Sequence, residues 1–62
     1  MRLEWYDVDK LDEAKRLAEI AENYLGQVVG ISETLAGFRI WIKSKNEICF
    51  EKVDEYLQSI YS

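Results

Sequence analysis

The segment 38–43 alternates between apolar residues and residues that could bind a ligand. Phe38, Ile40 and Ile42 occupy one set of positions, and Arg39, Trp41 and Lys43 occupy the other. This period of two is typical of a β-strand, in which successive side chains point to opposite faces. Two cations that flank an indole could stack on a nucleic-acid base and neutralise phosphates.

Two other interpretations fit the same three residues. Tryptophan and arginine are enriched among the residues that dominate binding in protein interfaces, so Arg39, Trp41 and Lys43 could anchor a protein partner. Alternatively, Trp41 packs against neighbouring aromatic residues while the two cations pair with Glu47, Glu51 or Glu4.

Catalytic residue types are scarce. The sequence has no histidine, which removes the imidazole base and the Ser-His-Asp and Cys-His arrangements. Its single cysteine, Cys49, would need a positive neighbour such as Lys43, or a helix start, to act as a nucleophile. A small apolar role in the core is the commoner one for a free cysteine. We therefore expect no catalytic residues and no enzymatic activity.

No motif indicates a metal or a cofactor. Asp7 and Asp9 match the first two ligands of the calcium-loop pattern, but the match fails at Leu11 and at Asp12, which stands where the pattern needs glycine. Helix capping explains the same aspartates. The three glycines form neither GxGxxG nor a phosphate-binding loop. We expect no metal, no cofactor and no small-molecule ligand.

The first half of the chain predicts a strand and a helix. In residues 1–6, Leu3 and Trp5 alternate with polar neighbours, which predicts a short strand with these two side chains facing the core. From Lys10 to Leu25 the apolar residues recur every three or four positions and form one stripe of a helix. Asp9 is the expected N-cap, and Gly26 is the expected left-handed residue that closes the helix.

Two more strands are predicted at 27–32 and 38–43, the first on its β-branched residues. The segment 33–37 is a plausible hairpin connection in which Gly37 can take a positive φ. Leu35 and Ala36 are unusual for an exposed turn, so they either tuck inward or mark a contact surface.

The last third allows two interpretations. Ser44 and Glu47 fit a capping box, which would give one helix from Lys45 to Tyr61. Alternatively, residues 47–50 alternate as a short strand, and a helix follows from about Lys52 to Tyr61. We favour the strand followed by a helix.

The predicted order is therefore β-α-β-β-(β)-α, in one small α+β domain that spans residues 1–62. We expect a two-layer sandwich in which two helices cover one face of a mixed sheet of three or four strands. The first strand is expected to run parallel to the second through a right-handed connection.

Charge and composition limit the classes of partner that this chain could bind. The chain carries 12 acidic and 8 basic residues, for a net charge of −4, whereas a nucleic-acid-binding domain normally has a basic footprint. The leading hypothesis is thus a small protein-interaction module that binds itself, as a homodimer, or a larger protein. Small accessory and inhibitor proteins, including phage-encoded ones, have this general profile. Single-stranded nucleic-acid binding through Arg39, Trp41 and Lys43 is the alternative.

Location follows from the same composition. A lone cysteine indicates a reducing compartment, and no apolar run approaches the length that crosses a membrane. The first residues also lack the basic-then-apolar layout of a signal peptide. We expect a cytoplasmic protein that does not bind membranes.

Overall fold

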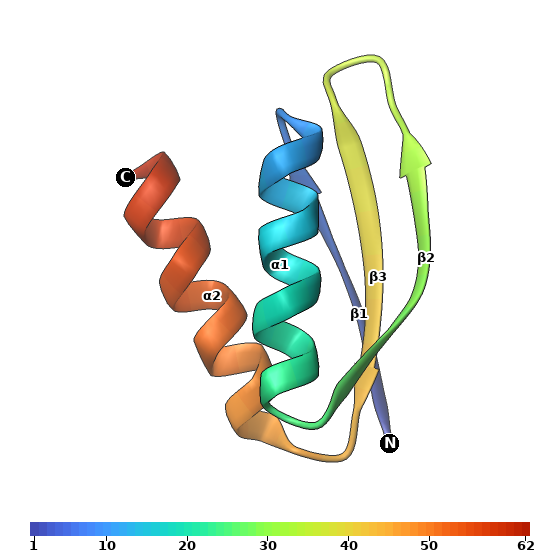
Figure 1. Ribbon diagram of the computed structural model, residues 1–62, viewed down its shortest axis with the longest axis vertical. Coiled ribbons are helices and arrows are strands. Elements are labelled where there is room, and N and C mark those ends of the chain that lie inside the picture. The colour runs from blue at the N-terminus through green and yellow to red at the C-terminus, as the bar shows by residue number, and fades with distance from the viewer.

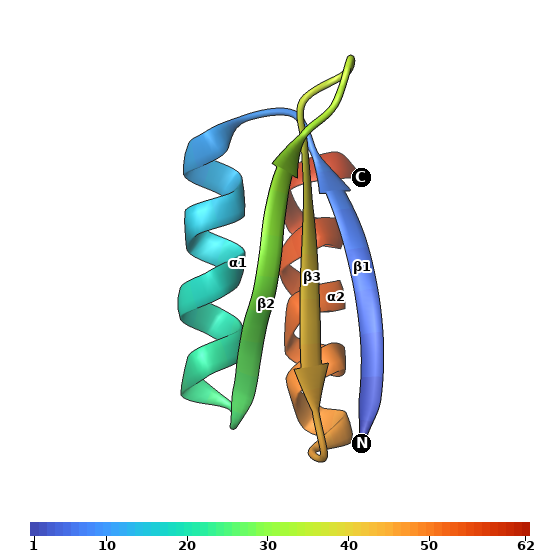
Figure 2. The same cartoon turned by 90° about the vertical axis from the view of Figure 1, so that its right-hand side faces the viewer.

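The alternating segment at 38–43 forms the middle of a three-stranded sheet. A computed structural model describes all residues from 1 to 62. Its elements are, in order, β1 (Arg2–Val8), α1 (Leu11–Asn23), β2 (Gly26–Glu33), β3 (Phe38–Ser44) and α2 (Glu47–Tyr61), as Figure 1 shows. Both helices lie on one side of the sheet, and Figure 2 looks onto the other side, which no element covers. The predicted two-layer α+β sandwich is confirmed.

The strand order in the sheet is β1-β3-β2, with each neighbouring pair antiparallel. β1 and β2 both run opposite to β3, so they point in the same direction, as expected, but β3 lies between them. The expectation of a mixed sheet is therefore wrong. Since β2 and β3 form a hairpin, β3 must be antiparallel to β2, and its insertion next to β1 leaves no parallel neighbours.

The core lies between the sheet and the two helices. Ile40 and Ile42 of β3 are completely buried, and Leu17 of α1 and Phe50 of α2 pack in the same cluster. The other buried members are small or β-branched, namely Val8, Ala14, Ala21, Cys49 and Val53. Each helix thus buries the middle of its predicted apolar stripe, whereas the end residues Leu11, Leu25 and Tyr61 are exposed.

The direction of the first strand's side chains differs from the prediction. β1 continues to Val8, which is buried, and Tyr6 packs against the core from the same face. Leu3 and Trp5 therefore point to the uncovered face, where they are 58% and 53% exposed. The predicted strand covers only residues 1–6 and so omits Val8. Val8 is the buried residue that shows which side of β1 faces the core, and Leu3 and Trp5 lie on the opposite side.

The residues that cap the two ends of α1 also differ from the predicted ones. Lys10 is the N-cap, in place of the expected Asp9, and the Glu13 carboxylate accepts hydrogen bonds from the backbone N–H groups of Asp9 and Lys10. At the other end the left-handed residue is Leu25, with φ of 66°, rather than Gly26. Gly26 is needed for a close approach, because a Cβ there would lie 2.6 Å from the Cys49 Sγ atom.

The short strand that we favoured at 47–50 does not form. Residues 47–50 form the first turn of α2. The structure therefore agrees better with the alternative prediction, one helix from Lys45 to Tyr61. Asn46 is its N-cap, since the Asn46 side chain accepts a hydrogen bond from the backbone N–H of Ile48. The Ser44 hydroxyl instead donates to the backbone oxygen of Leu25.

The hairpin between β2 and β3 turns at residues 34–37, where Thr34 and Gly37 exchange backbone hydrogen bonds. Gly37 has φ of 155°, and a Cβ at this position would lie 2.2 Å from the backbone oxygen of Val8. Only glycine fits there. Leu35 does not tuck inward, because its side chain is fully exposed at the tip.

Candidate protein interface on the open sheet face

The register of the sheet brings both tryptophans together on its uncovered face. Trp5 of β1 lies directly opposite Trp41 of β3. The pairs Leu3–Lys43 and Asp7–Arg39 flank them on the same face. We call this surface the open face, and it consists of Leu3, Trp5, Asp7, Gln27, Gly30, Ser32, Arg39, Trp41 and Lys43.

Arg39, Trp41 and Lys43 thus share one face, as their spacing predicts, whereas Trp5 was not foreseen there. The prediction for Trp5 follows from the alternation of Leu3 and Trp5 with polar neighbours in residues 1–6, which points these two side chains toward the core. Extending the strand to Val8 could have placed Trp5 correctly. Tyr6 and Val8 then form the apolar set that faces the core, and Trp5 falls on the other side of the strand.

Trp41 lies in the middle of the open face, next to a position of β2 that has no side chain. Gly30 is opposite Trp41, and a Cβ added at Gly30 would lie 3.6 Å from the Trp41 Cε3 atom. A β-bulge between Val28 and Gly30 breaks the register at this point. The absence of a side chain on Gly30 and the added twist of the bulge let the indole lie against the strand, so Trp41 is only partly exposed.

Arg39 is held by partners within the chain. Its Nε and Nη2 atoms donate hydrogen bonds to Asp7 Oδ1 at 2.8 Å and Oδ2 at 3.1 Å. Its guanidinium also lies 4.1 Å from the centre of the Trp5 ring. The hydrogen bond from Arg39 lowers the pKa of Asp7, and the hydrogen bond to Asp7 raises the pKa of Arg39. The two charges neutralise each other at one end of the open face.

Lys43 occupies the other end and forms no ion pair. The ion pairs of the structure involve Arg2, Arg16, Arg39 and Lys52, so neither Lys43 nor the following Lys45 has a carboxylate partner. The interpretation that pairs Arg39 and Lys43 with Glu47, Glu51 or Glu4 is therefore wrong for the two cations, although Trp41 does lie beside an aromatic residue, Trp5. It is Arg2, on the helix-covered face, that contacts Glu4 and Glu47.

A wide hollow of about 290 Å³ adjoins this end of the open face. It lies where β1 and β2 begin and β3 ends, and its lining includes Lys43, Lys45 and the apolar side chain of Leu25. Leu25 is 80% exposed. Cationic and apolar groups thus continue beyond Lys43 onto the adjoining loops.

The charges are distributed unevenly between the two layers. The two helices carry eight acidic and three basic side chains. The strands and connections carry the remaining four acidic and five basic ones. The acidity of the chain therefore belongs to the helical layer, and the open face bears one negative and two positive charges.

The cysteine that was considered as a nucleophile lies apart from this face. Cys49 is on α2, completely buried, and its Sγ atom is 3.7 Å from the backbone oxygen of Ala21. Burial raises the pKa of this thiol. No three acidic or cysteine side chains gather where they could hold a metal ion. Neither helix is long and apolar enough to cross a membrane.

Comparisons of this chain with models of protein families, with curated proteins and with solved structures found no match.

Proposed function

We propose that this chain is a protein-interaction module of the accessory or inhibitor type, which acts without catalysis and binds protein through the open face. The observation that carries the proposal is the Trp5–Trp41 pair on a sheet face that no helix covers. Aromatic residues at the centre of such a face, with charged residues around them, have the composition of interface hot spots.

The exposed apolar area supports the same conclusion. Leu3 and Trp5 are more than half exposed and adjoin Trp41 and Lys43 in the register. Small soluble domains seldom leave a contiguous aromatic patch open to water unless a partner covers it. The partner is either a second copy or a larger protein, in the cytoplasm as the lone buried thiol Cys49 suggests.

The variant Trp41→Ser tests this proposal. Light scattering behind size exclusion would compare its molar mass, over a range of concentrations, with that of the natural sequence. We expect weaker association and an unchanged cooperative melt. Ile48→Ser is the matched control, because Ile48 is 48% exposed on the helical layer and its loss should leave association unaltered. If Trp41→Ser abolishes the melt, Trp41 is a core residue and the proposal is wrong.

Single-stranded nucleic-acid binding is the second candidate, favoured by the neighbouring indoles and the unpaired Lys43. Two observations weigh against it: Asp7 already neutralises Arg39, and the net charge is −4. Binding of this kind would quench tryptophan fluorescence at low ionic strength and weaken steeply with salt. If short oligonucleotides leave the fluorescence unchanged at low salt, this candidate is excluded.

A further inference from the structure

We propose that the protein partner supplies an extended segment that adds as a fourth strand to the free edge of β1, and that this segment alternates basic with apolar residues. The inference rests on the proposed function, because it specifies how a protein partner binds beside Trp5 and which side chains it presents.

β1 is an edge strand whose outer backbone groups have no partner. It pairs only with β3, over all seven residues from Arg2 to Val8 and without a bulge. Outside the sheet, the backbone of these residues forms no hydrogen bond to a turn or a cap. Figure 2 shows no element beside β1 on its outer side. A regular, unprotected edge of this kind accepts a further strand through main-chain hydrogen bonds.

The opposite edge of the sheet is less suited to strand addition. β2 has a bulge between Val28 and Gly30, where its register with β3 shifts. A bulge twists an edge and interrupts its hydrogen-bonding pattern, so it is one of the usual protections of edge strands. In Figure 2, α1 also flanks β2. An added strand is therefore expected at β1.

The flank of α2 that lies beside β1 is acidic. Glu47 contacts Arg2 of β1. Burial, and next the charge of Asp54, raises the pKa of Tyr6 on β1, so the Asp54 carboxylate also acts on this strand. Glu51 lies one helical turn after Glu47 and one turn before Asp54, which places it on the same side of the helix. We call these three carboxylates the acidic flank.

Most of the negative charge beside β1 has no cation. Arg2 pairs with Glu4 and Glu47, whereas no ion pair includes Glu51 or Asp54. With Glu4, this side of β1 therefore holds four carboxylates and one guanidinium. The side chains of an added strand alternate between the two faces of the sheet, so every second one would point toward α2. Basic side chains at these positions complement the unpaired carboxylates.

The remaining side chains of the added strand would lie on the other face, beside Leu3 and Trp5. These two are 58% and 53% exposed. Asp7, the next residue of β1 on that face, is already paired with Arg39. Apolar side chains in the partner would extend the cross-strand row of Trp5 and Trp41 and withdraw Trp5 from water. The partner segment is therefore basic on one face and apolar on the other.

A second copy of this chain fits the edge poorly. In an antiparallel pairing of two β1 strands, a two-fold axis perpendicular to the sheet leaves the helices of both copies on the same side. The two acidic flanks would then face each other across the junction and repel. The second β1 would also present Glu4 at the positions where the first copy needs cations. The charges therefore favour a foreign, basic segment.

A designed peptide tests this inference by nuclear magnetic resonance. The probe has the length of β1, seven residues, is blocked at both ends, and alternates lysine with valine. Added to the isotope-labelled natural chain, it should shift the amide signals of residues 2–8. It should also slow the hydrogen exchange of every second N–H group along β1, because alternate groups point away from β3.

Two control peptides separate charge from main-chain pairing. The first has glutamate in place of lysine and should bind at least about tenfold more weakly, because it meets the acidic flank with like charge. The second keeps lysine and valine but carries a methyl group on each backbone nitrogen. It cannot donate hydrogen bonds to the edge, so its binding should also fall by at least about tenfold.

A double variant of the chain tests the acidic flank directly. Glu51→Gln with Asp54→Asn removes the two unpaired carboxylates, so the Kd of the lysine peptide should rise about fivefold at low ionic strength, and by less as salt is added. Asp12→Asn with Glu22→Gln is the matched control, because both residues are exposed on α1, have no ion pair, and give the same change in net charge. It should leave the Kd within about twofold of the natural value. A circular-dichroism melt checks that each variant is folded.

The other outcomes overturn the inference in distinguishable ways. If the lysine peptide shifts no signal at millimolar concentration, or if the glutamate peptide binds as tightly, the partner is not a basic strand, and the proposed function stands or falls with Trp41→Ser. Shifts confined to β2 and β3 keep the open face and refute the edge. Equal binding of the methylated peptide shows that main-chain hydrogen bonds do not hold the partner. If residues 2–8 become protected when the chain alone is concentrated, a second copy is the occupant.

Discussion

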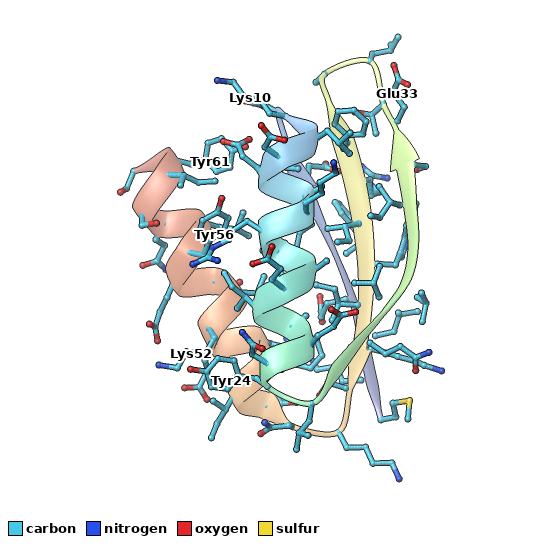
Figure 3. The ribbon with its side chains drawn as sticks, in the orientation of Figure 1. Lys10, Tyr24, Glu33, Lys52, Tyr56 and Tyr61 are labelled. Atoms are coloured by element: carbon cyan, nitrogen blue, oxygen red, sulfur yellow. The ribbon has the colours of Figure 1, made fainter.

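The Tyr61 hydroxyl donates a hydrogen bond of 2.6 Å to the Glu13 carboxylate and accepts one of 2.8 Å from the backbone N–H of Asp9. Figure 3 shows Tyr61, in the last turn of α2, directed toward the start of α1. Glu13 in turn accepts from the backbone N–H groups of Asp9 and Lys10. One phenol therefore joins the end of the second helix to the cap of the first.

This pair should make stability fall at both ends of the pH scale. The hydrogen bond from Tyr61 lowers the pKa of Glu13 below its usual 4.5, so the contribution of Glu13 is present above that pH and is lost as the pH falls through the lowered value. Burial, followed by the bond to Glu13, raises the pKa of Tyr61 above 10, so the contribution of Tyr61 is lost as the pH rises past 10.

The variant Tyr61→Phe tests this linkage. Around neutral pH it should melt a few degrees below the natural sequence, and the two melts should converge as the pH falls through the lowered pKa of Glu13. By NMR the pKa of Glu13 should rise toward 4.5 in the variant. If the pKa of Glu13 is the same in both proteins, the hydrogen bond does not govern it.

Tyr6 should control unfolding in alkali. Burial, with smaller effects of Asp54 and Glu4, raises the pKa of Tyr6 to about 12. Because the folded value lies above the unfolded value of 10, the stability that Tyr6 contributes is complete below pH 10 and is lost between pH 10 and pH 12. Tyrosinate absorbance should show one tyrosine titrating near pH 12, and Tyr6→Phe should remove it and reduce the loss of helix over this interval. The absence of any tyrosine that titrates near pH 12 would contradict this.

How far the sequence predicts this structure depends on the length of each pattern. The helical stripe from Leu11 to Leu25 and the alternation from Phe38 to Lys43 extend over several repeats, and the structure has a helix at Leu11–Asn23 and a strand at Phe38–Ser44. Each pattern consists of several apolar residues at regular spacing, so one side chain that departs from it does not change the predicted element.

The predictions are wrong where the local structure depends on a single residue. Val8, at the end of β1, determines which face Leu3 and Trp5 occupy, and a strand ended two residues early reverses both. Gly26 looks like a helix-closing glycine, but its position is fixed by the approach of Cys49 from α2, which is distant in sequence. The open face was only half predictable for the same reason: Arg39, Trp41 and Lys43 share one strand, whereas Trp5 joins them through strand pairing.

The contact between Gly26 and Cys49 is testable by a double-mutant cycle. A methyl group at Gly26 would lie 2.6 Å from the Cys49 Sγ atom and 2.9 Å from the backbone oxygen of Ala21. We expect Gly26→Ala to lower the free energy of unfolding by about 1–3 kcal/mol, as overpacking of a core does.

Replacing Cys49 by alanine in the same chain removes the sulfur, so the effect of Gly26→Ala should be smaller there than in the natural sequence. Some cost should persist because of Ala21. Urea unfolding of the four proteins gives the coupling energy. An effect of Gly26→Ala that is identical in both backgrounds would show that the sulfur is not what glycine accommodates.

Asn46 should account for the helical start of residues 47–50. Its Oδ1 atom accepts a hydrogen bond of 3.2 Å from the backbone N–H of Ile48, and its Nδ2 atom donates one of 3.0 Å to the backbone oxygen of Tyr24. The first bond caps α2, and the second ties that cap to the end of α1. Asn46→Ala removes both and should lower the free energy of unfolding by about 1 kcal/mol or more.

Two further variants separate these roles. Asn46→Asp keeps the acceptor for Ile48 but loses the donor to Tyr24, so its stability should lie between those of the natural sequence and Asn46→Ala. Asn23→Ala, at the exposed end of α1, is the control and should change stability by less than about 0.5 kcal/mol. Urea unfolding measures all three. If Asn46→Asp is as unstable as Asn46→Ala, the bond to Tyr24 dominates, and the helical start at Glu47 depends on the neighbouring helix rather than on its own cap.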